Sequence, residues 1–223
     1  MTVHPSPGCH TSGPQRGRRI TGAARRSSPW IVGLLLVLGL ALVANGTWIH
    51  AKAALAQVLL DRAWLRTVDG AATARAWPWA DSWPVARLQI ADSAQIVLAG
   101  VSGEALAFGP GLIDGSVAPG SPGTTAIAGH RDTHFRALRH IGIGDTVRLQ
   151  DASGQLHRYR ITATEIVHED EARIRLDGDR HRLLLVTCWP FDAVDPNGPL
   201  RYLVLAEPVA AVAGYSAADL PEG

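Results

Sequence analysis

Three side chains of different chemistry stand at the ends of short apolar segments. Cys188 ends the run LLLVTC, His130 follows the run TAIAG, and Arg201 comes just after the turn PNGP. A nearby imidazolium or guanidinium favours the thiolate form of a cysteine, which is its nucleophilic form. A histidine can deliver a proton to a leaving amine, and an arginine can hold a developing oxyanion. Together these residue types are sufficient for acyl transfer through a thioester.

Cys188 has no evident partner for a disulfide bond. The other cysteine, Cys9, precedes a long apolar segment, and a membrane crossed by that segment would keep the two thiols apart. An unpaired thiol in an oxidising compartment is either buried and inert or retained for its reactivity. Taken alone, each residue has a simpler interpretation. Cys188 could be an inert core residue, His130 could cap a turn, and Arg201 could form a surface ion pair. The combination of the three favours a reactive thiol.

Residues 30–49 contain no charged side chain. As a helix this segment is about 30 Å long, which matches the hydrocarbon core of a bilayer. Five arginines precede it and only Lys52 closely follows it, a bias that places the N-terminus in the cytoplasm. We therefore expect a single-pass protein of the inner (cytoplasmic) membrane, with the rest of the chain on the periplasmic or extracytoplasmic side. The competing interpretation is a cleaved signal peptide, because small residues resembling cleavage sites occur at 51–56.

The rest of the chain divides by composition. Leu55, Val58 and Leu59 recur at helical spacing after the apolar segment, and a stretch rich in Trp and Pro follows them. From residue 85 onward, short strand-like runs are bounded by Gly, Pro, Asp and Ser. The predicted organisation is a basic cytoplasmic tail (1–29), a transmembrane anchor (30–49), a helical stalk and lead-in (50–84), a catalytic β domain (85–209) and a C-terminal tail (210–223).

The β domain is expected to contain few helices. Its predicted strands are 86–90, 95–101, 124–128, 145–150, 157–167, 182–187 and 202–206. The helical candidates 104–108 and 133–140 are too few and too short to cover both faces of a parallel sheet. A mainly β fold follows, as a mostly antiparallel barrel or sandwich, and the Gly- and Pro-rich run 109–123 is predicted to be a loop.

Charge and motif content argue against other classes of protein. Six of the 21 Lys and Arg residues lie in the first 60 positions, so the remainder carries 15 basic against 20 acidic side chains and does not favour a nucleic-acid partner. His130, His134 and His140 suggest zinc, but a structural zinc site favours Cys ligands or a tighter set of His and carboxylates. The tripeptide His130-Arg131-Asp132 matches part of a kinase catalytic loop, without the Gly-rich phosphate loop or the downstream Asn.

Three strings of sequence carry a resemblance to a known family. The segments TAIAGHRDTHF, LLLVTCWPF and NGPLRYLVL resemble the signature segments of the sortase family of cysteine transpeptidases. The resemblance spans about residues 85–208. The order His, Thr-Cys, Arg is specific for this family, although each string alone would be weak evidence. The GHRDTHF run and the single N-terminal anchor most resemble the class found in Gram-negative bacteria, class GN. The resemblance implies a closed eight-stranded sortase-type β-barrel with short helices, preceded by an N-terminal transmembrane helix.

The resemblance also implies a reaction and the roles of three residues. Cys188 is the expected nucleophile, His130 the general acid and base, and Arg201 the residue that stabilises the oxyanion and positions the substrate. The implied substrate is a secreted or membrane protein with an LPxTG-like sorting signal, and the implied acyl acceptor is an amine. No metal or organic cofactor is required for this chemistry.

Further residues are expected to contact the substrate. They are Thr187, Trp189, Ile174, Leu176 and His134. The Pro-rich segment 189–200 is predicted to be a stiff wall that narrows the groove, and the loop 168–181 is predicted to form the opposite wall, with an apolar residue against the leucine of the signal. The acidic run 169–171 lies where some sortases carry calcium ligands, although we predict a solvated loop there.

Two other functions stay open from the sequence. A hydrolytic cysteine peptidase on the same barrel would release an acid even when an amine is added. A non-enzymatic β-barrel that binds envelope proteins would tolerate the substitution Cys188→Ala. An L,D-transpeptidase also uses Cys and His, but it is expected to contain a Ser-x-Gly-Cys segment, which this sequence lacks.

Overall fold

A computed structural model describes residues 29–170, 176, 180–193, 195 and 198–209 of the chain. The predicted C-terminal tail and, apart from Pro29, the predicted basic tail lie outside the described residues. The chain divides into two units, residues 1–48 and 49–223, which are described separately.

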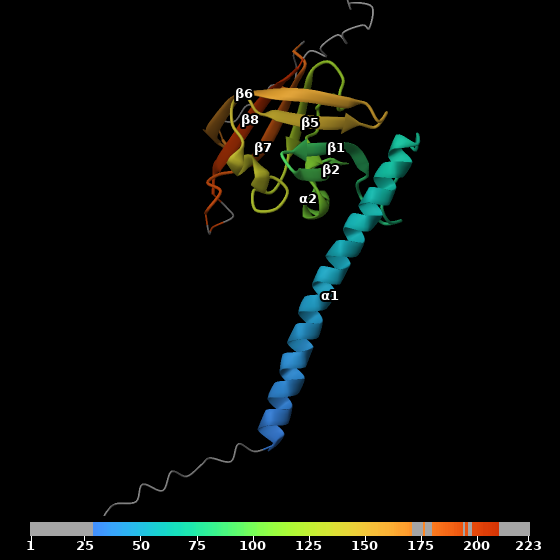
Figure 1. The fold of residues 1–223 in the computed structure, drawn as a ribbon, viewed down its shortest axis with the longest axis vertical. Coiled ribbons are helices and arrows are strands. Elements are labelled where there is room, and N and C mark those ends of the chain that lie inside the picture. Colours follow the sequence, from blue (N-terminus) through green and yellow to red (C-terminus); the bar gives the residue numbers. More distant parts are fainter. Residues whose placement is uncertain (1–28, 171–175, 177–179, 194, 196–197, 210–223) are drawn as a thin grey trace, which may run out of the picture. The chain divides into compact units, whose positions relative to one another are not determined.

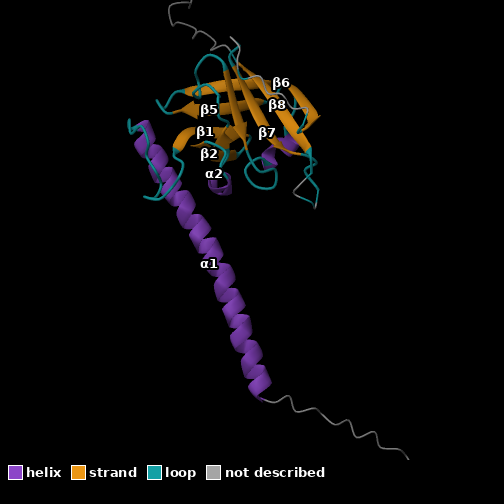
Figure 2. Cartoon of the chain, turned by 180° about the vertical axis from the view of Figure 1, so that it is seen from behind, coloured by secondary structure: helices purple, strands orange, loops and turns teal. Residues whose placement is uncertain are grey.

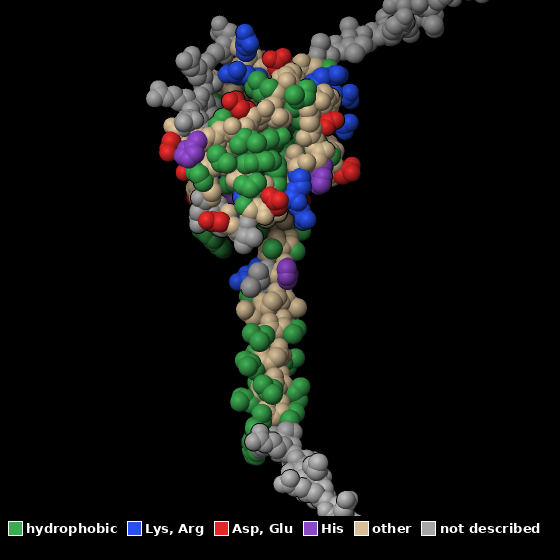
Figure 3. Space-filling view, turned by 90° about the vertical axis from the view of Figure 1, so that its left-hand side faces the viewer, with side chains coloured by type: hydrophobic (Ala, Val, Ile, Leu, Met, Phe, Trp, Pro, Cys, Tyr) green, Lys and Arg blue, Asp and Glu red, His purple; other side chains and the backbone are tan. Residues whose placement is uncertain are grey.

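Helix α1, Pro29–Val68, contains both the predicted anchor and the predicted stalk. In the first unit its side chains are almost all exposed and apolar, and hydrophobic side chains cover the face of this part of the helix that Figure 3 shows. Within the described residues, α1 is the one helix long and apolar enough to cross a membrane. The sequence therefore predicted this apolar helix correctly.

The second unit contains the last turns of α1, and these pack against the β domain. Leu60 and Trp64, both almost fully buried, contact Ile96, Leu98 and Ala105. Ala105 belongs to α2, Gly103–Phe108, whose N-cap Ser102 accepts a hydrogen bond from the Ala105 amide. This cluster fixes the end of α1 to one side of the sheet, because burying large apolar side chains is the main favourable term in folding.

The β domain is a closed barrel, seen from two sides in Figures 1 and 2. The order around it is β1-β2-β3-β4-β7-β8-β6-β5. Its strands are β1 (Pro84–Ile90), β2 (Ser93–Ala99), β3 (Gly111–Leu112), β4 (Thr124–Ala128), β5 (Thr146–Asp151), β6 (Leu156–His168), β7 (Arg182–Cys188) and β8 (Leu200–Pro208). One short 3-10 helix, η1 (Arg136–His140), follows β4.

The closed barrel with few helices confirms the predicted fold class, but one detail of the prediction was wrong. The pairing is mostly antiparallel, as expected, and β2 with β3 and β4 with β7 are the parallel pairs. The predicted loop 109–123 contains β3, whose two residues are too few to show any alternation of polar and apolar side chains. β3 pairs with β2 on one side and β4 on the other, and so helps to close the barrel.

Alternate residues of the strands fill the barrel. On β7, Leu183 and Leu185 are fully buried, and on β8 Val204 and Ala206 are their counterparts. Phe135 and Leu138, from the segment after β4, are also buried in this core. Since successive side chains of a strand point to opposite faces, the residues between them point outward.

The end of the barrel where β7 begins contains a polar cluster. The imidazole Nε2 of His157 lies 2.7 Å from the Asp151 carboxylate, and the Tyr159 hydroxyl lies 2.9 Å from Nε2 of His181. Burial, and then the charge of Asp151, raises the pKa of Tyr159 to about 12. Burial, and then His157, lowers the pKa of His181. The Tyr159 hydroxyl therefore keeps its proton and can donate it to a neutral His181 ring.

We predict that acidification destabilises the fold in two stages. Because the pKa of His181 is lowered in the folded state, the unfolded chain binds the proton more readily, and stability falls as the pH drops through about 6.5. Burial alone raises the pKa of Asp151, but hydrogen bonds from His157, Ser153 and Gln155 reverse this and lower it. Its contribution is lost as the pH falls below about 4.

The melting temperature between pH 7.5 and 5.5 tests the first stage. His181→Gln keeps an acceptor for Tyr159 but cannot be protonated, so its melting temperature is expected to fall less over this range than that of the wild type. An equal fall in both proteins would contradict the role given to His181.

Candidate active site

The ends of three neighbouring strands meet at the other end of the barrel. β4 runs parallel to β7, and β8 runs antiparallel to β7 on its other side. The last residue of β7 is Cys188, and its direct partner across the strands is Arg201, the second residue of β8. His130 follows the end of β4 by two residues. Three residues that are distant in sequence are therefore carried by adjacent strands at one rim.

Cys188 and Arg201 point to the outside of the barrel. Leu185 and Thr187 are buried on the inner face of β7, so the half-buried Cys188 lies on the outer face by alternation. Side chains of directly opposed residues lie on the same face of a sheet. The register Cys188↔Arg201 thus places the thiol and the guanidinium next to each other on the outer surface.

His130 reaches the same surface through the pairing of β4 with β7. The last described pair of this ladder is Ala128↔Val186, and the Gly129 amide donates to the Val186 carbonyl at 3.1 Å. Extending this parallel register by two residues brings His130 alongside Cys188. A side chain at Gly129 would point into the ring of buried Phe135, so the exposed His130 points the other way, outward.

The guanidinium of Arg201 is held by groups on both sides. Its Nη1 donates to the carbonyls of Gly198 and Leu200, at 2.7 and 3.0 Å, and its Nη2 donates to a carboxylate oxygen of Glu169. The Glu169 amide in turn donates to the Pro199 carbonyl at 2.8 Å. These bonds fix the guanidinium at the start of β8, beside the thiol.

Glu169 was predicted as part of a solvated loop, and its side chain is 47% exposed as expected, but it also has a partner that the sequence did not predict. Its carboxylate pairs with Arg201, whose side chain is only 27% exposed. The neighbouring Asp170 is largely exposed and pairs with His168. Glu171, the third member of the acidic run, lies outside the described residues. Sequence alone gave no sign of the pairing, because 32 positions separate Glu169 from Arg201.

His134 lies beside His130, with the two ring centroids 6.3 Å apart. Its Nδ1 is buried and has no hydrogen-bond partner within the described residues. Burial, and then the proximity of His130, lowers the pKa of His134. A neutral His134 ring therefore borders the site, next to the general acid and base that the sequence predicted.

Two of the expected substrate contacts have other roles. The Thr187 side chain is 2% exposed, and its hydroxyl donates to the Gly129 carbonyl at 2.7 Å. It points into the barrel, so the prediction that this side chain contacts the substrate was wrong. Trp189 is half-buried and stacks on Tyr202 with ring centroids 5.5 Å apart, while Phe191 packs edge-on against both rings. These three aromatic rings form a cluster immediately after the nucleophile position.

The other two expected contacts lie in the loop between β6 and β7. Ile174 lies outside the described residues. Leu176 is half-buried, and its Cδ1 is 3.4 Å from the position that a Cβ on Gly115 would take. Leu176 therefore lies against the segment between β3 and β4, and its proposed contact with the substrate stays a prediction.

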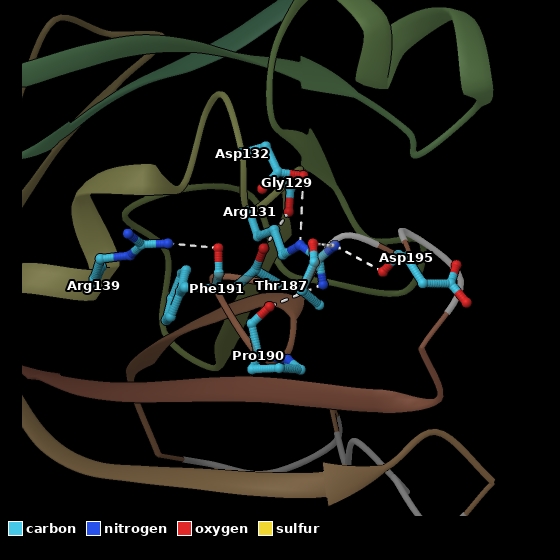
Figure 4. A network of polar contacts seen from close by, with 9 residues as sticks. Gly129, Arg131, Asp132, Arg139, Thr187, Pro190, Phe191 and Asp195 are labelled. Carbon is cyan, nitrogen blue, oxygen red and sulfur yellow. Dashed lines mark hydrogen bonds and ion pairs between the residues drawn. The ribbon is translucent and has the colours of Figure 1, made fainter. Parts of the chain in front are cut away.

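The side chain that the sequence analysis missed most clearly is Arg131. It is 3% exposed, yet the sequence suggested no role for it beyond its place in the TAIAGHRDTHF segment and in a kinase-like tripeptide. Its guanidinium contacts three carbonyls of the segment that follows Cys188, as Figure 4 shows in part. An arginine in the short segment between β4 and the buried Phe135 is a weak signal, since exposed arginines are common in this chain.

The described residues include no group of three or more His, Cys, Asp or Glu side chains arranged to hold a metal ion. His130 and His134 are adjacent, but His140 lies at the end of η1 and does not join them in such a group. The arrangement offers a thiol, an imidazole and a guanidinium on one surface. This set suits covalent acyl transfer.

Comparison with known proteins supports this interpretation. The family model of the Sortase domain matches residues 87–209, which is more than half of the chain. The chain belongs to the sortase family. Sortases are cysteine transpeptidases. Sortase D of Bacillus subtilis (strain 168) is 34% identical over 114 residues, which are 51% of this chain and 57% of that protein.

Solved sortase structures show the same fold. Sortase A from Corynebacterium diphtheriae superposes with a TM-score of 0.52 at 22% identity, over 60% of this chain and 64% of that one. Sortase C-1 from Actinomyces oris gives a TM-score of 0.51 at 25% identity, over 57% of this chain and 75% of that one. The matches therefore cover just over half of this chain and less than two thirds of the B. subtilis and C. diphtheriae chains. The assignment to class GN stays a prediction.

We predict that Thr187→Val destabilises the fold although it preserves the shape of the side chain. The substitution leaves the Gly129 carbonyl without its donor, which costs about 1–3 kcal/mol for a buried group. Thr187→Ser keeps the hydroxyl and is the matched control. Urea denaturation should show a lower midpoint for the valine variant than for the serine variant, and the reverse order would contradict the importance of this bond.

Proposed function

We propose that this sortase is a membrane-anchored transpeptidase that cleaves an LPxTG-like sorting signal and transfers the acyl group to an amine. One observation carries the proposal: Cys188 lies on the outer face of β7, directly opposite Arg201, with the end of β4 and His130 on the other side. This arrangement leaves the thiol open to an extended peptide and flanks it with a base and a cation.

The first half-reaction forms a thioester. The Cys188 thiolate attacks the carbonyl carbon of the Thr-Gly bond, and the carbonyl oxygen becomes negatively charged. Arg201, fixed at the rim by the carbonyls of Gly198 and Leu200, offers N–H donors and positive charge to that oxygen. The C–N bond then breaks as the His130 imidazolium gives its proton to the departing amine. The acyl group stays on sulfur, and His130 is left neutral.

The second half-reaction restores the enzyme. An acceptor amine attacks the thioester carbonyl and passes a proton to neutral His130. The C–S bond breaks, Cys188 leaves as the thiolate, and His130 is again an imidazolium. The same three residues therefore act in both directions, and water replaces the amine only when no amine is at hand.

The outer face beside Cys188 suits an extended apolar peptide. Val186 on β7 and Leu203 and Leu205 on β8 are half-buried and lie on the same side of the sheet as the thiol. Half-buried apolar side chains on a sheet surface can pack against the leucine and proline of a sorting signal. His134 borders this face and Leu176 lies in the loop between β6 and β7, where we expect them to line the groove.

The apolar part of α1 supports the membrane anchor. It is uncharged from Trp30 to Ile49, five arginines precede it, and Lys52 follows. Positive charge favours the cytoplasmic side, so we propose a cytoplasmic N-terminus and an extracytoplasmic catalytic domain. The GHRDTHF segment and this single N-terminal helix support class GN as the subclass.

Mass spectrometry of the full chain in detergent tests the reaction. Incubation with a peptide containing an LPxTG-like signal is expected to add the mass of the acyl fragment to Cys188, and triglycine is expected to remove it as an amide. Cys188→Ala should abolish both products. Arg201→Lys should slow thioester formation by about 10²–10³-fold, because a single ammonium cannot replace the fixed guanidinium donors.

The controls separate this proposal from the alternatives. Product released only as the acid in the presence of triglycine would indicate a peptidase. Signal cleavage that persists in Cys188→Ala would contradict the proposed nucleophile, and no cleavage with unaltered binding of envelope proteins would indicate a binding module.

A further inference from the structure

Arg131 is a buried cation whose environment is made of backbone carbonyls. Its Nη1 donates to the Pro190 carbonyl and its Nη2 to those of Ala193 and Asp195, each at 2.9 Å. Its Nε lies 3.4 Å from the Asp132 carboxylate, which is largely exposed. Four of the five N–H groups of the guanidinium thus have acceptors, which is what a buried charge requires.

The bonds of Arg131 connect the segment that carries His130 to the segment that carries Cys188. Arg131 directly follows His130, and Pro190 is the second residue after Cys188. On the other side, Thr187 and Gly129, which directly precede Cys188 and His130, are joined by a 2.7 Å hydrogen bond. The segments that carry the imidazole and the thiol are therefore bonded to each other both before and after the reactive residues (Figure 4).

We propose that Arg131 is a positioning residue of the active site: by binding the segment after Cys188, it sets the placement of the His130 imidazole relative to the thiol. This inference rests on the proposed function. Arg131 is 3% exposed and has no part in binding the substrate itself. It acts through the backbone, because its fork of donors fixes three carbonyls of one segment at once, which a lysine ammonium cannot reproduce.

A neighbouring arginine strengthens the same connection at the surface. Arg139, in η1, donates to the Phe191 carbonyl, and its guanidinium carbon lies 5.7 Å from the centre of the Phe191 ring. The segment from Gly129 to η1 thus binds the chain after Cys188 at Pro190, Phe191, Ala193 and Asp195. Arg139 is exposed and Arg131 is buried, so of the two it is Arg131 whose contacts are shielded from water.

The test uses Arg131→Lys in the full chain, with Arg136→Lys as the matched control. Arg136 is exposed and lies in the same segment, and its side chain makes no hydrogen bond to the described residues of the segment after Cys188. We expect kcat for thioester formation to fall about 10²-fold in Arg131→Lys, because a small misplacement of the reacting groups has an effect of this size. KM should change less than threefold. The control should match the wild type.

A second readout does not depend on any substrate. The rate at which iodoacetamide alkylates Cys188 is measured from pH 5 to 9 by peptide mass spectrometry, which separates Cys188 from Cys9. Because the imidazole beside the thiol shapes this pH profile, the profile of Arg131→Lys should shift toward that of His130→Gln. A purely structural role would lower the melting temperature and leave the profile of the folded protein unchanged.

The possible outcomes distinguish a positioning role of Arg131 from a purely structural one. An unchanged kcat and an unchanged alkylation profile in folded Arg131→Lys would overturn the inference while leaving the transpeptidase intact. If the lysine variant does not fold, Arg131→Met, which removes the buried charge, takes its place, and unfolding of both variants would overturn the inference in favour of a structural role. Activity that persists in Cys188→Ala would remove the proposed function, whereas the alkylation profile would still report on Arg131.

Discussion

The pairing of β4, β7 and β8 is the constraint on which the site depends. The parallel β4–β7 ladder and the antiparallel β7–β8 ladder place the end of one strand, the end of the next and the start of the third at a single rim. Alternation then decides the direction of the side chains. Thr187 points inward and binds Gly129, so Cys188 must point outward, opposite Arg201. A shift of one residue along β7 would bury the thiol and expose the threonine.

This dependence explains why polar bonds are concentrated around the rim. A nucleophile at the end of a strand is followed by a loop, and a loop has few backbone partners of its own. Here the carbonyls of that loop are bound by Arg131 and Arg139, and those at its end by Arg201. Glu169 completes the arrangement by pairing with Arg201. Three arginines thus hold the surroundings of one thiol, and only one of them is proposed to meet the substrate.

Sequence predicted the parts of the structure that carry a periodic or chemical signal. The strands with alternating or wholly apolar residues, the apolar helix and the order His130, Cys188, Arg201 were all visible in the printed sequence. Strand β3 could not be predicted, because its two residues are too few to show a period. The parallel pairs could not be predicted either, because strand order depends on contacts between residues that are distant in sequence. The inward direction of Thr187 and the roles of Arg131 and Glu169 depend on register and on burial, which single residues do not reveal.

The central claim is that an imidazole and a guanidinium flank one thiol on the outer surface of the barrel. A crystal structure of the enzyme trapped as its thioester with a sorting-signal peptide would test it most directly. The account predicts the acyl group on Cys188 Sγ along the outer face of β7 and β8, with the acyl oxygen within hydrogen-bonding distance of Arg201 and an imidazole nitrogen of His130 facing the sulfur. An acyl group on any other residue, or a thioester whose oxygen lies away from Arg201 while His130 points to solvent, would contradict it.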